Sequence, residues 1–199
     1  MQTDTLEKLY VDELRDMYNA EKQLVRAIPK MAKAANSPEL RSALEEHLDV
    51  TKRQVEKLEE IFKDLGRPAS GKTCKGMAGI LEEGQDIIDE DFDEDVMDAG
   101  IISAAQKVEH YEIASYGTLR AFARTRGDRR AAEILDEILA EEKDADKTLT
   151  RIAEASINAR ADGESGEMDE DEEDEEEKPQ RAGSPQARGR GNGSTKPNR

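Results

Sequence analysis

Hydrophobic residues recur at every third or fourth position over most of the first 158 residues of this 199-residue chain. Such a period places them on one face of an α-helix, and it is interrupted at clusters of Gly, Pro, Asn and Ser that favour turns. The pattern predicts four long helices and one shorter helix, at about 5–35, 38–65, 75–89, 96–126 and 129–158.

Two of the interruptions are short, so the helices on either side of each one are expected to run antiparallel. Ser37 and Pro38 suit the cap and the first position of the second helix, and Gly127 and Asp128 end the fourth helix and cap the fifth. A longer crossover joins the two hairpins and contains the short helix. We therefore expect an all-α fold: a ferritin-like four-helix bundle of two antiparallel hairpins, with a fifth short crossover helix.

The helical pattern ends near residue 158. Residues 169–177 are all acidic, and residues 181–199 are mostly Gly, Pro, Ser, Asn and basic residues. Neither segment has enough apolar side chains to form a core. We therefore predict a helical domain over residues 1–158 and a disordered, acidic-then-basic tail over residues 159–199, whose partner the sequence does not identify.

Acidic residues interrupt the apolar faces of three predicted helices. Two stretches align at an offset of 91 residues, and this alignment sets Glu21 of the first helix opposite Glu112 of the fourth. The helices that follow also align, with Thr51 corresponding to Glu142. An ionised carboxylate on an apolar face is costly unless it is paired or binds a cation. Acids from several helices that meet inside a bundle are typical of a metal site.

Four further polar side chains lie near these acids on the helical wheels, namely Glu109, Asp146, His47 and Gln54. Mixed oxygen and nitrogen donors suit Fe or Mn, in a mononuclear or dinuclear centre that could oxidise the metal with O₂ or peroxide. The alternative is a hydrogen-bonded network without metal in a non-catalytic protein. The Glu-x-x-His pair of di-iron bundles is absent. His110 is expected on the outer side of its helix.

Several segments of the chain resemble one known family. The segment AQKVEHYEIASYGTL at 105–119 is the longest, and the others are AEKQL at 20–24, His47-Leu48, Cys74 with Met77, and Glu141-Glu142-Lys143 with Asp146. Together they resemble the YciE/YciF-type ferritin-like stress proteins over residues 3–157. The resemblance implies a dimeric five-helix domain with a di-metal centre, linked to stress responses. Val50 stands where a glutamate is usual in that family.

Charge and composition argue against several other kinds of function. The chain has a net charge of −17, of which residues 1–160 carry −11 (24 basic, 35 acidic) and residues 161–199 carry −6 (6 basic, 12 acidic). This acidic balance argues against a nucleic acid partner. The lone Cys74 excludes an internal disulfide. Without a signal sequence or a stretch of about 20 apolar residues, we expect no membrane insertion and a cytoplasmic protein.

The segment GRPASGKT at 66–73 matches the P-loop pattern of nucleotide-binding proteins. A P-loop joins a β-strand to a helix, whereas the residues before Gly66 are charged and helix-periodic. We therefore expect a crossover loop here, and nucleotide binding is a remote alternative. The aspartates at alternate positions over 89–95 lack the glycine and final glutamate of a calcium loop.

Overall fold

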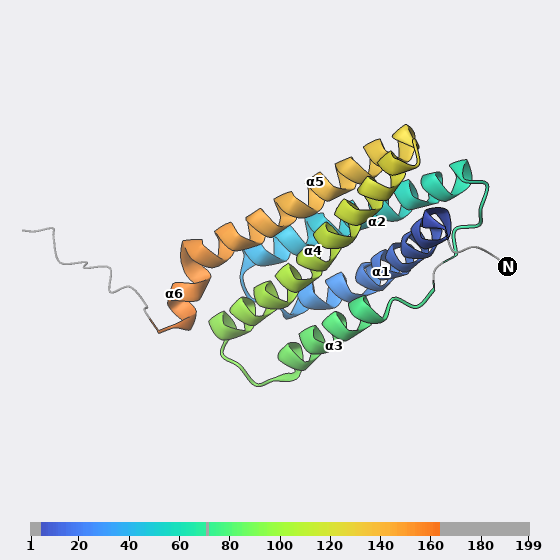
Figure 1. The fold of residues 1–199 in the computed structure, drawn as a ribbon. Coiled ribbons are helices and arrows are strands. Elements are labelled where there is room, and N and C mark those ends of the chain that lie inside the picture. Colours follow the sequence, from blue (N-terminus) through green and yellow to red (C-terminus); the bar gives the residue numbers. More distant parts are fainter. Residues whose placement is uncertain (1–4, 71, 164–199) are drawn as a thin grey trace, which may run out of the picture. The chain divides into compact units, whose positions relative to one another are not determined.

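The structure is a computed structural model that describes residues 5–70 and 72–163. These residues form long helices and no strand, in the order and direction shown in Figure 1. The elements are α1 (Leu6–Ala34), α2 (Pro38–Asp64), α3 (Lys75–Asp89), α4 (Glu94–Thr125), α5 (Arg129–Ile152), a π-helical turn (Ala153–Ile157) and α6 (Asn158–Ala161). The predicted all-α class is confirmed.

The helices begin and end where the sequence supplies caps. The Ser37 hydroxyl accepts a hydrogen bond from the Leu40 amide at 3.3 Å, and the Asp128 carboxylate accepts one from Ala131 at 3.0 Å. Gly127 adopts a φ of 77° between α4 and α5, a left-handed conformation that glycine tolerates without steric cost. These local signals are the reason that both hairpin turns were predictable.

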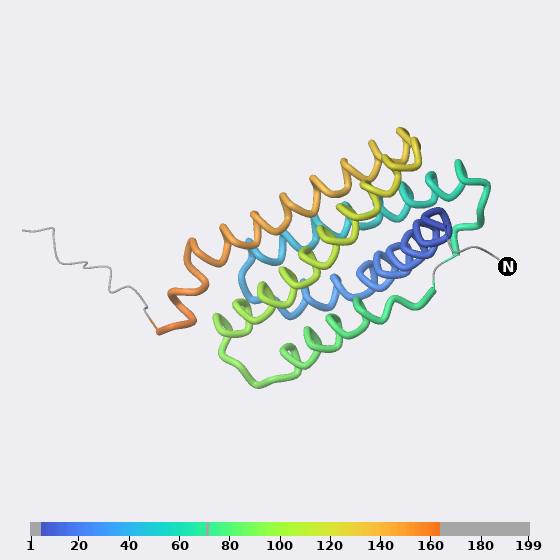
Figure 2. The backbone as a smooth tube through the Cα atoms, in the orientation of Figure 1, coloured from blue at the N-terminus to red at the C-terminus, as the bar shows by residue number. Residues whose placement is uncertain are grey.

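The two hairpins pack into a four-helix bundle. The α1–α2 hairpin lies against the α4–α5 hairpin, with α1 beside α4 and α2 beside α5. The short helix α3 packs against both α4 and α1, and Figure 2 shows it running alongside them. The interior between the helices is filled mainly by Leu, Ile, Ala and Met side chains, with buried aromatic rings at Tyr10, Phe62 and Tyr116. This is the architecture that the hydrophobic pattern predicted.

One buried acid has a structural role that the sequence did not indicate. Asp98 of α4 is 1% exposed, and its two carboxylate oxygens accept hydrogen bonds from the backbone amides of Asn36 and Ser37, each at 2.7 Å. Those amides belong to the turn between α1 and α2. Asp98 therefore attaches this turn to the neighbouring hairpin.

The observed helix ends differ from the expected ones at two places. Helix α4 begins at Glu94, two residues before the expected start. Helix α5 gives way to the π-helical turn after Ile152, and helical structure continues to Ala161. The predicted disordered tail lies, from residue 164 onward, outside the described residues. Within the described part, no helix has the length and apolarity that crossing a membrane requires.

Candidate metal centre

The sequence-predicted acids meet in the middle of the bundle. Helix α1 contributes Glu21, α4 contributes Glu109 and Glu112, and α5 contributes Glu142. Their exposed fractions are 3% or less. Each lies on the apolar face of its helix, so the packing that buries the core also buries the carboxylates.

Four side chains form a compact group of potential ligands. His47, Glu109, Glu112 and Glu142 each place one donor atom within 4.8 Å of all the others. The His47 Nε2 atom lies 3.4 Å from Glu109 and 3.8 Å from Glu142. Three carboxylates and one imidazole are donors that Fe and Mn accept. We call these four residues the ligand group.

Glu21 lies next to the ligand group and is held by a tyrosine. The buried Tyr116 hydroxyl donates a hydrogen bond to the Glu21 carboxylate. Repulsion from Glu21 contributes to the raised pKa of Glu112, so the two carboxyls are neighbours at this centre. The two residues that align at the 91-residue offset therefore do meet in space.

Gln54 faces the ligand group from α2. Its amide nitrogen donates to Glu142 and, at 3.2 Å, to Glu141. Glu141 in turn accepts a hydrogen bond from Lys57 at 2.8 Å. This orientation leaves the Gln54 Oε1 atom buried without a partner. Lys57 was not among the sequence-predicted residues, because the side chain reaches Glu141 from another helix.

Most of the buried polar atoms at this centre lack hydrogen-bond partners. Among the described residues, seven such atoms belong to the ligand group, Glu21 and Gln54: Glu21 Oε2, His47 Nε2, Gln54 Oε1, Glu109 Oε2, both Glu112 oxygens and Glu142 Oε2. Buried acceptors are rarely left unpaired in native proteins, because each costs about 1–3 kcal/mol. The residues therefore fit a cation, which would satisfy several of these atoms at once.

Burial and mutual repulsion shift the pKa values at the centre. Burial, together with repulsion from Glu142, raises the pKa of Glu21 to about 8. Burial also raises the pKa of Glu142 to about 7, and it raises the pKa values of Glu109 and Glu112 well above their usual range. Burial lowers the pKa of His47 to about 4, so its imidazole is neutral and free to donate a lone pair. In the absence of a cation, protons must hold some of these carboxyls neutral.

The structure does not bring Asp146 into this group. Its carboxylate accepts a hydrogen bond from Gln106 at 3.1 Å and lies 3.4 Å from the exposed His110. His110 is therefore on the outer side of α4, as expected. Val50 lies one turn after His47 and lines a groove that reaches the centre.

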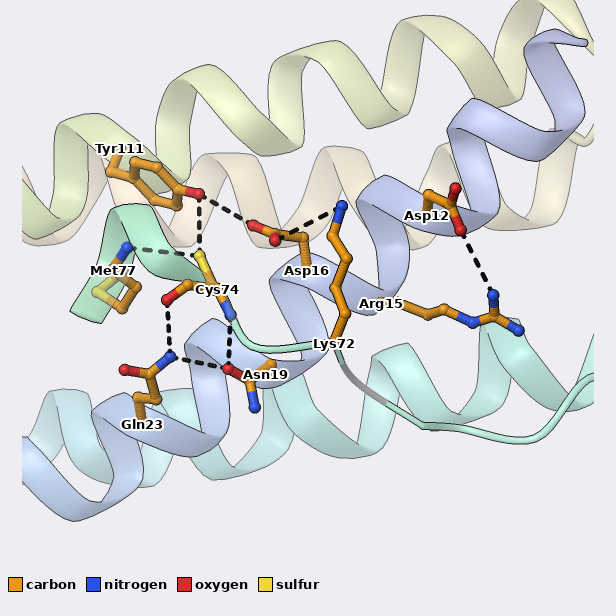
Figure 3. A network of polar contacts seen from close by, with 9 residues as sticks. All are labelled: Asp12, Arg15, Asp16, Asn19, Gln23, Lys72, Cys74, Met77 and Tyr111. Atoms are coloured by element: carbon orange, nitrogen blue, oxygen red, sulfur yellow. Dashed lines mark hydrogen bonds and ion pairs between the residues drawn. The ribbon is translucent and has the colours of Figure 1, made fainter. Parts of the chain in front are cut away.

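The crossover loop is organised by a second polar network, which includes none of the ligand group (Figure 3). The Cys74 sulfur lies 3.0 Å from the Tyr111 hydroxyl, which also donates to Asp16 at 3.1 Å. The Cys74 amide donates to Asn19 at 2.8 Å, and Lys72 lies 3.8 Å from Asp16. These contacts attach the loop to α1 and α4.

The P-loop pattern lies in this crossover. Helix α2 precedes it and ends at Asp64, and the described residues contain no strand that could lead into a phosphate-binding loop. Lys72, the lysine of the pattern, faces Asp16. The surroundings therefore lack the strand-to-helix geometry on which that motif depends.

Comparison with known proteins agrees with the fold. The family model described as "Domain of unknown function (DUF892)" matches residues 5–162. Protein YciF of Escherichia coli (strain K12) is 40% identical over 166 residues, which are 83% of this chain and all of YciF.

Solved structures give the same result. The crystal structure of the E. coli stress protein YciF has a TM-score of 0.76 at 41% identity, covering 78% of this chain and 99% of that one. YcfI from Rhodopseudomonas palustris has a TM-score of 0.73 at 41% identity, with coverages of 75% and 95%. A protein from Xanthomonas campestris has a TM-score of 0.65 at 26% identity, with coverages of 80% and 99%. The chain therefore belongs to the DUF892 family, as a relative of the stress protein YciF with a ferritin-like helical fold.

Proposed function

We propose that this protein binds one or two Fe or Mn ions in the centre of its bundle and, under stress, oxidises the divalent metal with peroxide or O₂, which accepts the electrons. The observation that carries the proposal is the set of buried acceptor atoms without hydrogen-bond partners around the ligand group. One divalent cation would offset the mutual repulsion of several carboxylates and satisfy their unpaired oxygens.

The proposal assigns a direct ligand role to the ligand group. Glu21 lies beside the ligand group on the opposite hairpin from Glu112, so both carboxylates would help to hold the ions. Gln54 is assigned an outer role, because its amide nitrogen faces Glu142. Asp146 is assigned none, because its carboxylate is directed to Gln106.

A bound Fe or Mn ion would supply one-electron redox chemistry. The chain's own residues would do the rest. The carboxylates balance the charge of the ion, and neutral His47 supplies a nitrogen donor. The Tyr116 hydroxyl orients Glu21, in the way that outer hydrogen bonds orient metal ligands. The surrounding apolar core limits the access of water to Glu21 and Glu112, which are buried.

A second candidate function is a metal-free structural role. Two direct hydrogen bonds, from Tyr116 to Glu21 and from Gln54 to Glu142, favour it, since they already satisfy one oxygen of each acid. In this case the raised carboxyl pKa values would keep the other acids protonated. The seven unpaired atoms favour the metal over this alternative.

The two candidates differ in equilibrium metal content. We would purify the protein without chelators, measure its metals by elemental analysis, and titrate the chelated protein with Mn(II), or with Fe(II) without oxygen. The proposal expects stoichiometric binding that Glu112→Gln abolishes. Glu56→Gln, which changes an exposed acid of α2, is the matched control. Equal binding by the two variants, or no binding by the native protein, would refute the metal assignment.

Two further proposals rest on the resemblance to YciF and its relatives. The protein is proposed to form homodimers, which light scattering of the purified chain would test at several concentrations. It is also proposed to act in the cytoplasm during stress, as a relative of a stress protein. Cell fractionation of the source organism, before and after oxidant exposure, would test this location.

A further inference from the structure

A groove between α2 and α5 reaches the ligand group from the protein surface. Its volume is about 340 Å³, and its lining includes His47 and Glu109. This volume holds several water molecules, so the groove has room for a hydrated ion.

We propose that this groove is the access route through which divalent cations enter and leave the centre, with His47 and Glu109 as the first ligands that an ion meets. This inference rests on the proposed function, because it describes how the same centre is loaded. It adds a direction of entry, an order of ligand contact and a role for residues outside the ligand group.

Exposure falls from the groove toward the interior. The side chain of His47 is 13% exposed, that of Glu109 is 4% exposed and that of Glu142 is fully buried. Glu21 and Glu112 are also buried and do not line the groove. An ion that arrives through the groove therefore contacts His47 and Glu109 before it reaches the two innermost acids.

The rim of the groove carries negative charge that is not neutralised. Glu46 and Asp144 both line it, and in the described part of the chain neither forms an ion pair with a basic side chain. The other acids at this rim do have cationic partners, because Arg151 pairs with Glu39 and Lys57 pairs with Glu141, each at 2.8 Å. Acids that line a cleft with apolar walls raise the local concentration of cations and speed their association.

The walls below the rim are mainly apolar, and Val50 and Ala145 are among their smaller side chains. Val50 follows His47 by three residues on α2, and Ala145 follows Glu142 by three residues on α5. Neither side chain can ligate a cation, so an ion would pass these positions without being held there. A larger apolar side chain at Ala145 would narrow the passage without changing a ligand.

The test compares the rate of metal loading with the amount bound at equilibrium. Mn(II), or Fe(II) without oxygen, would be mixed rapidly with the chelated protein. We expect the double variant Glu46→Gln/Asp144→Asn to load about two- to tenfold more slowly at low salt, with a weaker salt dependence and unchanged stoichiometry. The double variant Asp86→Asn/Glu90→Gln, which removes the same charge at the end of α3, should load at the native rate.

A second variant tests the passage itself. Ala145→Leu should slow both loading and release while the final stoichiometry stays native, and Ala27→Leu in the groove between α1 and α3 is its control. If both groove variants load metal at the native rate and with the native stoichiometry, the proposed access route is wrong. The proposed metal centre is not affected by that result. Failure of the native protein to bind metal at equilibrium would instead overturn the centre and, with it, the route.

Discussion

Tyr116 and Glu21 are joined inside the bundle by a hydrogen bond between opposite hairpins. The Tyr116 hydroxyl of α4 donates to the Glu21 carboxylate of α1, and both side chains are fully buried. The bond links one metal-ligand candidate to the hairpin that carries Glu109 and Glu112. It also satisfies only one Glu21 oxygen, since the other has no partner within the described residues.

Replacing Tyr116 by Phe tests this bond. The change removes the donor and leaves a buried carboxyl unpaired, so we expect a loss of about 1–3 kcal/mol in the free energy of unfolding. Because the bond orients Glu21, Mn(II) affinity should fall by about tenfold. Urea unfolding and metal titration would measure the two effects.

Tyr10 provides the control for this substitution. Its ring is also fully buried, but its hydroxyl has no hydrogen-bond partner in the described structure. Tyr10→Phe should therefore be neutral or slightly stabilising and should leave metal affinity unchanged. Equal losses in the two variants would mean that the Tyr116–Glu21 bond has no special role.

The Glu112→Gln substitution should affect the metal-free and metal-loaded proteins in opposite directions. Without metal, an amide avoids the cost of a buried carboxyl among other acids, so at pH 8 we expect the variant to be more stable than the native protein by about 1–3 kcal/mol. With saturating Mn(II), the native protein gains binding free energy and the variant does not. Thermal unfolding with and without metal would show a reversed order of stability. The same order under both conditions would argue against a centre that is built around Glu112.

The stability of the metal-free protein should fall as pH rises from about 6.5 to 8. Burial raises the pKa of Glu21 to about 8 and that of Glu142 to about 7, so in this range the folded state holds protons that the unfolded state has released. Proton release on unfolding makes the free energy of unfolding decrease with pH. Below pH 6.5 the lowered pKa of His47 makes the free energy of unfolding rise with pH, which opposes the effect of the acids. The range above pH 6.5 is therefore the informative one.

Bound metal should remove this pH dependence. A cation binds the deprotonated carboxylates, so its affinity for the folded protein increases between pH 6.5 and 8. This gain in binding free energy compensates for the decrease in the free energy of unfolding. Chemical unfolding at a series of pH values, with chelator or with Mn(II), measures both curves. A metal-free protein whose stability does not change between pH 6.5 and 8 would contradict the burial of protonated acids at the centre.

Asp98→Asn should destabilise the fold without affecting the metal centre. The amide loses one of the two acceptor oxygens and directs an N–H group toward a backbone donor of Asn36 or Ser37, so we expect a loss of about 1–3 kcal/mol. Asp95→Asn is the control, because Asp95 forms an exposed ion pair with Arg160 that should contribute less than about 1 kcal/mol. Both variants should bind Mn(II) with the native affinity, and reduced binding in Asp98→Asn alone would show that the turn and the centre are coupled.

The fold was predictable because its signals are local. The helical period, the Ser37 and Asp128 caps and the turn at Gly127 act within a few residues of the chain, so they can be recognised in the sequence. The same period placed Glu21, Glu112 and Glu142 on buried faces. The internal alignment then indicated that acids from both hairpins would meet, and the structure brings them together.

The partner of each polar side chain was decided by tertiary structure alone. A helical wheel placed Asp146 near Glu142, but the side chain turns toward Gln106, while Gln54 turns its nitrogen toward Glu142. The helical wheel also gave no indication that Asp98 would reach the α1–α2 turn. The hydrogen-bond partner of each side chain depends on its rotamer and on how far one helix is shifted along another. The hydrophobic period of a single helix carries no information about either.

The sequence by itself thus determined which faces are buried and which acids lie on them, because burial follows from a repeat within each helix. Only the packed bundle decided that His47 would join three glutamates within 4.8 Å, and that a groove would reach them between α2 and α5. Those features arise where side chains from different helices approach in three dimensions, so their geometry is set by interhelical packing.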